Sequence, residues 1–192
     1  MKTKTQQMLL ASMFSALTAI GAFIKIPMPP YPVPMTLQTM FVFLSGLLLP
    51  ARTAFYSQLV YVLLGLIGIP IFTNGGGIAY LLDPTFGYLL AFLACAPLMS
   101  KLAEQTLYKG RRVAFSAGCL AIILGVQVLG VAYMSLVYSQ HLASPLSFSK
   151  VFYIATIFIP LDVIKLFVAT ILALRLRKSA PAIFSPSTAL PK

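Results

Sequence analysis

Long apolar runs recur along almost the whole chain, separated by short polar, glycine-rich or proline-rich segments. A helix that crosses a membrane needs roughly 20 predominantly apolar residues. Hydrophobic residues make up 59% of the chain and charged residues only 9%, whereas a soluble domain carries about 25% charged residues. The apolar runs are too numerous for one soluble core, so the sequence predicts an all-α integral membrane protein.

Six of the runs predict transmembrane helices. The predicted spans cover residues 7–26, 35–49, 53–72, 85–103, 113–138 and 150–176. Lys2 and Lys4 ahead of the first run would also suit a signal peptide, but we expect an uncleaved span, because the run is long and further spans follow it. We expect residues 1–178 to form one membrane domain. Residues 179–192 are rich in Pro, Ser and Ala, which predicts a disordered cytoplasmic tail.

The basic residues predict the orientation in the membrane, because lysines and arginines flank spans chiefly on the cytoplasmic side. With six spans, one side receives 11 of the 14 lysines and arginines, the other receives Lys25 and Lys150, and Lys165 lies within the membrane. The sequence therefore predicts that both termini are cytoplasmic. The net charge of +11 is explained by this distribution and requires no nucleic-acid partner.

Two ionisable residues, Asp162 and Lys165, lie in the middle of the last apolar run, although the chain has only three acidic residues. Ionised groups at such a depth cost about 2.5–3.5 kcal/mol each. Their spacing places both on one helical face, and Pro160 is expected to bend the helix beside them. The pair predicts a buried site for a polar ligand, with a self-neutralising structural ion pair or a proton relay as alternatives.

A glycine-rich segment between the third and fourth spans is a second candidate. Its residues Asn74, Gly75, Gly76 and Gly77 would let the backbone approach a ligand closely. Tyr80 follows and would either stack on a flat ligand or anchor at the membrane interface. The segment matches no phosphate-binding motif, and the alternative is a flexible connection.

A stiff proline-rich segment, residues 27–34, leads into the second span and would act as a lid or as a spacer. Thr36 and Gln38 begin that span and need polar partners. In the first span, five small residues recur at helical spacing, which allows close helix packing in lipid. They are Ala11, Ser12, Ser15, Ala16 and Ala19. These residues predict either packing within the chain or a docking face for another membrane protein.

Catalytic and metal-binding patterns are missing from the sequence. It has one histidine, no ATP-binding motif, and neither a metal-ligand set nor a nucleophile with its base. Cys95 and Cys119 lie in apolar runs and are interpreted as small buried hydrophobes. We therefore expect neither an enzyme nor a metal site, and no cofactor.

Five segments carry a resemblance to a known family. In chain order they are residues 33–46 (VPMTLQTMFVFLSG), 61–72 (YVLLGLIGIPIF), 74–77 (NGGG), 83–88 (DPTFGY) and 160–165 (PLDVIK). They resemble the biotin-specific substrate-binding (S) subunits of energy-coupling factor (ECF) transporters, the BioY family. The similarity covers roughly residues 8–176 and leaves the tail uncovered.

This resemblance implies a six-helix bundle in a prokaryotic plasma membrane, with a high-affinity biotin site that opens outward. It implies a partner module of two ATPases and one transmembrane coupling subunit, which docks partly on small residues of the first helix. That docking motif is alanine-based in the family, and here Ser15 interrupts it. The implied biotin-binding residues are Asp162, Lys165, Asn74, Gly75, Gly76, Gly77, Tyr80, Thr36, Leu37 and Gln38.

Biotin suits the polar pair in the last span. Its ureido ring offers two N–H donors and a carbonyl, and its tail ends in a carboxylate. Asp162 is a natural acceptor for a ureido N–H, while Lys165 would serve either the ureido carbonyl or the tail carboxylate. A proton-coupled carrier, an S subunit for another vitamin and a membrane scaffold remain as alternative functions.

Overall fold

The computed structural model describes residues 3–27, 33–141 and 148–184, which are mostly helical. The tip of the proline-rich loop, part of the polar loop before the last span, and the end of the tail lie outside these residues. In chain order, the elements are α1 (Lys4–Phe23), β1 (Lys25–Ile26), β2 (Met35–Thr36), α2 (Gln38–Leu48), α3 (Ala51–Leu66), η1 (Ile78–Leu82), α4 (Phe86–Gln105), η2 (Leu107–Lys109), α5 (Arg112–His141), α6 (Phe148–Ser179) and α7 (Pro181–Phe184).

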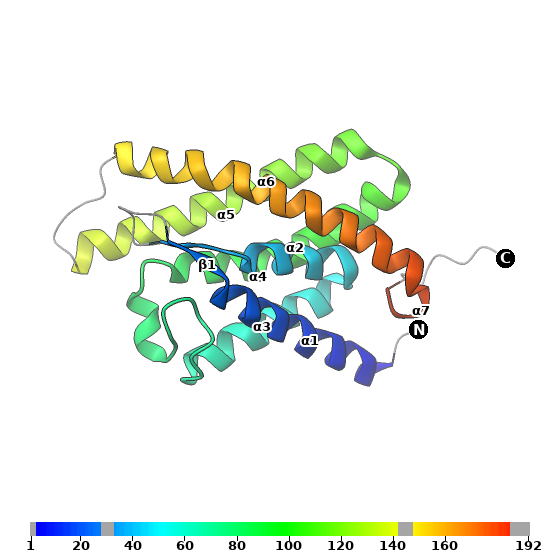
Figure 1. Ribbon diagram of the computed structural model, residues 1–192, viewed down its shortest axis with the longest axis horizontal. Coiled ribbons are helices and arrows are strands. Elements are labelled where there is room, and N and C mark those ends of the chain that lie inside the picture. The colour runs from blue at the N-terminus through cyan, green and yellow to red at the C-terminus, as the bar shows by residue number, and fades with distance from the viewer. Residues whose placement is uncertain (1–2, 28–32, 142–147, 185–192) are drawn as a thin grey trace.

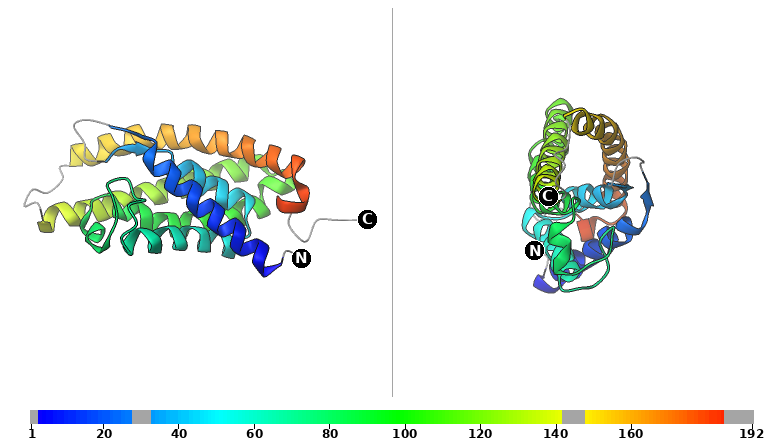
Figure 2. Two further views of the ribbon diagram at one scale, coloured as in Figure 1. Left: turned by 60° about the horizontal axis from the view of Figure 1, so that its bottom comes forward. Right: turned by 90° about the vertical axis from the view of Figure 1, so that its left-hand side faces the viewer.

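The helices α1 to α6 run roughly along one axis (Figure 1). α2 and α4 form the interior: α2 packs on α1, α4 and α6, while α4 packs on α2, α3 and α5. The view along the axis in Figure 2 shows α5 and α6 beside each other on one side of the bundle. Every residue of α2 from Val42 to Leu48 is buried, so its neighbours shield this helix from the surroundings.

Each predicted span overlaps one of the helices α1 to α6. Four of them, α1, α4, α5 and α6, are long and apolar enough to cross a membrane. α2 has 11 residues and α3 has 16, so α2 at about 1.5 Å per residue is shorter than the roughly 30 Å of a hydrocarbon core. A short helix is tolerated here because α2 is surrounded by protein.

Two span boundaries differ from the sequence prediction. Residues 35–36 are not the start of a helix but form the strand β2, which pairs antiparallel with β1, placing Lys25 opposite Thr36. The third helix ends at Leu66 rather than at residue 72, because Gly68 has a φ of +118° and Pro70 follows two residues later.

The segment after α3 folds back onto that helix. The N–H of Gly77 donates to the carbonyl of Gly65 over 2.7 Å, and Phe72 pairs with Gly75 in an isolated β-bridge. The ring of Phe72 is buried against Gly65 and lies 4.6 Å from the ring of Tyr80, centroid to centroid. These contacts make the glycine-rich segment a packed part of the fold.

Three segments meet at the end of the molecule that holds both termini. The carbonyl of Leu47 lies in the last turn of α2, where Pro50 stops the helix and the final carbonyls lack partners within it. It accepts hydrogen bonds from the Tyr108 hydroxyl (2.6 Å) and from Nη2 of Arg177 (2.9 Å). The Arg177 guanidinium also lies 3.7 Å from the centroid of the Tyr108 ring. We call these three residues the Arg177 clasp.

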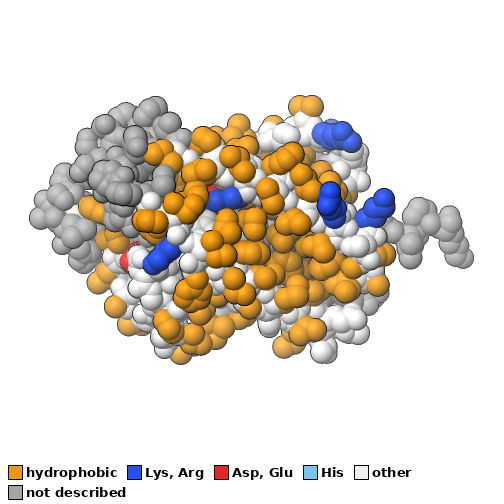
Figure 3. All heavy atoms as spheres, in the orientation of Figure 1, with side chains coloured by type: hydrophobic (Ala, Val, Ile, Leu, Met, Phe, Trp, Pro, Cys, Tyr) orange, Lys and Arg blue, Asp and Glu red, His pale blue; other side chains and the backbone are white. Residues whose placement is uncertain are grey.

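The surface divides into apolar and basic regions. Figure 3 shows hydrophobic side chains over the middle of the visible face, with most of the visible Lys and Arg side chains near the end that holds both termini and others farther toward the hairpin. At this end, Pro181–Phe184 form the short helix α7 with Phe184 buried, although the sequence predicts disorder from residue 179. Burial of this one aromatic ring accounts for the difference.

We predict that Gly65→Ala destabilises the fold, because a methyl group at this position would overlap the Phe72 ring. Overpacking of this kind costs about 1–3 kcal/mol. Thermal unfolding can be followed with a thiol-reactive dye, since Cys95 and Cys119 are buried and free. The matched control is Gly125→Ala in α5, where a Cβ meets nothing within 4 Å. An unfolding temperature of Gly65→Ala equal to that of the control would contradict the packing described here.

Candidate functional site

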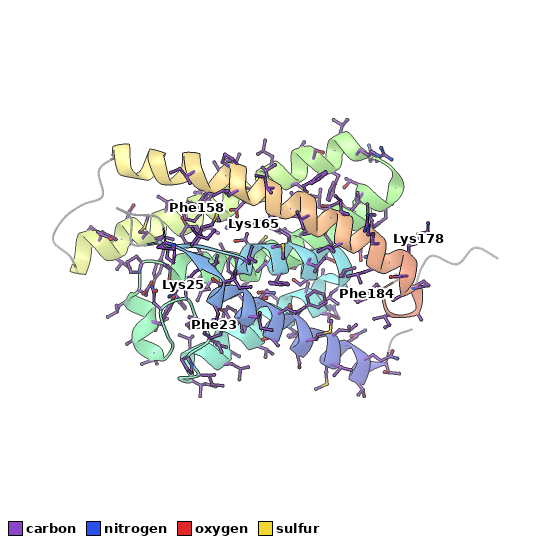
Figure 4. The ribbon with its side chains drawn as sticks, viewed as in Figure 1. Phe23, Lys25, Phe158, Lys165, Lys178 and Phe184 are labelled. Atoms are coloured by element: carbon purple, nitrogen blue, oxygen red, sulfur yellow. The ribbon has the colours of Figure 1, made fainter. Side chains whose placement is uncertain are left out.

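A pocket lies among α2, α4, α5 and α6, next to the β1–β2 hairpin. Its walls combine hydroxyl, amide and charged side chains with aromatic and aliphatic ones. The lining residues are Val33, Pro34, Thr36, Gln38, Thr39, Thr73, Thr85, Tyr88, Leu89, Phe92, Val126, Gln127, Phe158, Asp162 and Lys165. In Figure 4, Phe158 and Lys165 lie on α6 toward the hairpin end, away from Lys178 and Phe184 at the other end.

The charged pair forms the polar centre of this pocket. Asp162 and Lys165 are 2% and 7% exposed, and Nζ of Lys165 lies 2.9 Å from Oδ1 of Asp162. The other carboxylate oxygen, Oδ2, accepts from Nε2 of Gln127 on α5, also over 2.9 Å. The hydroxyl of Tyr88 on α4 in turn donates to Oε1 of Gln127 over 3.3 Å. Three helices therefore contribute to one continuous chain of hydrogen bonds.

This arrangement offsets the cost of burying two charges. A buried ion pair is tolerated when its geometry is good and further hydrogen bonds satisfy the remaining polar atoms, and here both oxygens of Asp162 have a donor. An ammonium group has three N–H donors, and Nζ of Lys165 uses one of them within the described residues. The other two are available for an acceptor on a ligand.

A second polar cluster is centred on Gln38 at the start of α2. Its Oε1 accepts from the hydroxyls of Thr36 and Thr73, each over 3.0 Å, and its Nε2 donates to the Tyr61 hydroxyl over 2.6 Å. The Tyr61 hydroxyl donates to the carbonyl of Ile71 over 3.1 Å. Gln38 thus ties the hairpin, α3 and the segment after α3 together at the pocket wall.

The glycine-rich segment reaches the pocket through hydroxyl side chains at its two ends, Thr73 and Thr85. Asp83 orients Thr85 by accepting from its N–H (2.8 Å) and its hydroxyl (2.6 Å), and it also accepts from the Asn74 amide over 3.2 Å. The Tyr80 and Thr85 hydroxyl oxygens are 2.8 Å apart. Burial raises the pKa of Tyr80 to about 12, so this phenol is neutral at physiological pH.

The structure brings together four of the sequence-predicted binding residues in the pocket lining: Thr36, Gln38, Asp162 and Lys165. The other six lie outside the lining; these are Leu37, Asn74, Gly75, Gly76, Gly77 and Tyr80. Gly75 and Gly77 adopt positive φ angles, and a Cβ at Gly76 would overlap the carbonyl of Ile69. The glycines therefore serve the tight fold of the segment.

The sequence prediction missed most of the neutral polar residues of the pocket. They are Thr39, Thr73, Thr85, Tyr88 and Gln127. A signal was present for Gln127, which is the one amide in the apolar run of residues 113–138. Like the Asp162 carboxylate, although at a smaller energetic cost, a buried amide needs a hydrogen-bond partner.

The small residues of α1 divide between two faces. Ala11 and Ser15 are buried and Ala19 is half-buried, on the side where α1 packs against α3 and α2. Ser12 and Ala16 are exposed. Of the five small residues, Ser12 and Ala16 are therefore the two that a partner docking on this helix can contact directly.

We predict that breaking the charged pair from one side is more damaging than neutralising both members. Lys165→Met leaves a lone buried carboxylate and Asp162→Asn leaves a lone ammonium, and each should cost about 3–5 kcal/mol of stability. The double variant contains no charge, and the amide oxygen introduced at position 162 can still accept from Gln127. Denaturant unfolding in detergent should therefore show a double variant more stable than either single one. If the loss of unfolding free energy in the double variant equals the sum of the two single losses, the coupling between Asp162 and Lys165 is contradicted.

Comparisons with known proteins agree with the geometry. The profile of the BioY family matches residues 1–182. The chain is 43% identical to a probable biotin transporter BioY of Lysinibacillus sphaericus, over 77% of this chain and 74% of that protein. It is 39% identical to the biotin transporter BioY of Thermotoga maritima, over 90% and 96% of the two chains. The crystal structure of the S-component for biotin from an ECF-type ABC transporter is similar with a TM-score of 0.68 and 26% identity, over 93% of this chain and 95% of that chain. The resemblance predicted from the sequence is confirmed, and the chain belongs to the BioY family.

Proposed function

We propose that this protein is the biotin-binding S subunit of an ECF-type uptake transporter. The observation that carries the proposal is the buried Asp162–Lys165 pair, held by Gln127 in a pocket of a BioY-family chain. The relatives are named as biotin transporters and the solved neighbour as an S-component for biotin. The family is one of transporter components, so the protein is not an enzyme.

The pocket has polar groups of the kinds that biotin requires. The Asp162 carboxylate can accept from a ureido N–H through its remaining lone pairs, and two N–H donors of Lys165 can serve a ureido carbonyl or the tail carboxylate. Aromatic side chains supply the apolar walls: the rings of Tyr88 and Phe158 are 6.4 Å apart, centroid to centroid, with 24° between their planes. Phe92 adds a third ring to the lining.

Biotin binding requires the pocket to widen. Its free volume is about 40 Å³, which is space for one or a few water molecules, whereas small-ligand sites usually span about 300–1,000 Å³. The wall formed by Val33, Pro34 and Thr36 lies in and just before the two-residue strand β2 rather than in a helix. We propose that this wall moves outward to admit the ligand.

The same proposal covers the membrane topology. Six spans in a prokaryotic plasma membrane, with both termini cytoplasmic, would bring the basic end of the molecule to the cytoplasm. Figures 3 and 4 support this orientation, because the basic end and the hairpin end lie at opposite ends of the long axis. The pocket would then open toward the outside, where biotin would be captured.

A subunit of this kind needs an energy-supplying partner. The sequence contains no nucleotide-binding motif, and we propose a module of one transmembrane coupling subunit and two ATPases. Ser12 and Ala16 on the exposed side of α1 are the proposed contact with the coupling subunit. Ala11, Ser15 and Ala19 would support this contact indirectly by holding α1 close to its neighbours.

We predict that the purified full chain binds biotin, and that Asp162→Asn and Lys165→Ala each weaken binding by about 1–3 kcal/mol, or roughly five- to 150-fold. Calorimetric titration measures this, with riboflavin and thiamine as competing vitamins. Two matched controls lie outside the pocket: Glu104→Gln removes a carboxylate, and Lys178→Ala removes an exposed lysine from the same helix as Lys165. Both should bind like the wild type.

Titration with biotinamide, which lacks the tail carboxylate, identifies the partner of Lys165. If the Lys165→Ala loss is as large for biotinamide as for biotin, Lys165 serves the ureido carbonyl. A smaller loss for biotinamide assigns it to the carboxylate. If wild-type chain gives no saturable heat with biotin, the proposed function is wrong.

We predict that Ala16→Trp keeps biotin affinity but reduces uptake to background in cells that also produce the coupling module, because the bulky ring lies on the exposed side of α1. Leu124→Trp on α5, at another exposed apolar position, is the control and should keep both binding and uptake. Ala11→Trp should instead destabilise the chain, because Ala11 is buried. Loss of biotin binding in Ala16→Trp would mean that this position packs within the chain.

A further inference from the structure

A second groove, remote from the biotin pocket, lies where the start of α3 meets the later part of α4. Its volume is about 290 Å³, and its walls come from two helices that pack closely together. The lining residues are Ala51, Arg52, Phe55, Tyr56, Pro97 and Lys101. Nothing in the proposed biotin capture uses this groove.

The groove combines two unpaired cations with apolar walls. Arg52 and Lys101 are exposed, and across the described residues the one ion pair is Asp162–Lys165, so neither cation has a carboxylate within 4.0 Å. The remaining lining is aromatic or aliphatic. A ligand that complements both the two cations and the apolar walls carries an anionic group next to an apolar moiety.

The position of the groove favours a lipid over a soluble anion. Phe55 and Tyr56 are 37% and 55% exposed, and Leu98 next to Pro97 is 51% exposed. In a membrane-embedded chain, such side chains contact acyl chains. Arg52 lies in the first turn of α3, directly after the end of α2, and Lys101 lies near the end of α4, which leads to Tyr108 of the Arg177 clasp. The proposed orientation brings this end to the cytoplasmic leaflet, where anionic lipids attract Lys and Arg. The groove also belongs to α3 and α4, whereas the proposed protein-docking residues lie on α1.

We propose that this groove binds an anionic phospholipid of the cytoplasmic leaflet. Arg52 and Lys101 hold the phosphate, Arg52 through its paired N–H groups and Lys101 as a point charge. Phe55, Tyr56 and Pro97 contact the upper part of the acyl chains. The inference rests on the proposed membrane orientation, and it does not depend on which vitamin the other pocket binds.

The test is native mass spectrometry of the purified full chain titrated with phosphatidylglycerol or phosphatidylcholine. We expect saturable preference for phosphatidylglycerol. Arg52→Gln and Lys101→Gln should each weaken that binding about fivefold, equivalent to about 1 kcal/mol per basic residue, and the double variant roughly 25-fold. Arg175→Gln with Lys178→Gln is the matched control, since it removes one exposed arginine and one exposed lysine from α6 outside the groove. This control should keep the preference.

Four outcomes would overturn the proposal. The first is an equal loss of phosphatidylglycerol binding in the control, which would show dependence on overall charge. The second is unchanged binding in the double variant. The third is competition by inorganic phosphate at concentrations similar to the lipid, which indicates a free-anion site. The fourth is a double variant that keeps lipid binding but loses assembly with the coupling module, which indicates a protein contact.

Biotin titration of the same samples separates this inference from the proposed function. The Arg52→Gln, Lys101→Gln double variant should bind biotin with wild-type affinity, because neither residue lines the biotin pocket. A chain that binds phosphatidylglycerol but no vitamin would refute the function and leave the lipid site standing. A chain that binds biotin but shows no preference for phosphatidylglycerol would refute the lipid site alone.

Discussion

The pairing of Asp162 with Lys165 is the interaction on which the arrangement of the bundle depends. Two charges can remain in an apolar interior only when each has a partner and the remaining polar atoms are satisfied. Gln127 from α5 and Tyr88 from α4 supply the additional hydrogen bonds. The hydrogen bonds that satisfy the charged pair of α6 therefore determine how these three helices pack together. The groups that stabilise the pocket are thus the same groups that can offer donors and acceptors to a ligand.

A strong energetic penalty made part of this site predictable from the sequence. Charges within a membrane span are costly enough that Asp162 and Lys165 stand out without a structure, and the apolar runs predict each long helix. The neutral residues Thr73, Thr85 and Tyr88 carry no comparable penalty. Tertiary packing alone decides that they face the pocket, so the sequence could not distinguish them from other polar residues near span ends.

The hairpin and the glycine-rich segment show a second limit of sequence reasoning. Two-residue strands such as β1 and β2 are too short to carry a periodic pattern. The sequence predicts that the glycines of this segment let the backbone approach a ligand, and in the structure Gly76 is in close contact with the carbonyl of Ile69. Glycine indicates close approach, but the sequence does not reveal which group approaches.

The Arg177 clasp gives α6 a second fixed point, in addition to the ion pair. Lys165 and Arg177 are 12 positions apart on one continuous helix, which is about 18 Å along its axis. One continuous helix therefore carries both the charged pair of the pocket and the side chain that closes over the end of α2. Any rotation of α6 about its axis at the pocket would therefore alter the hydrogen bonds of the Leu47 carbonyl at the far end of the helix.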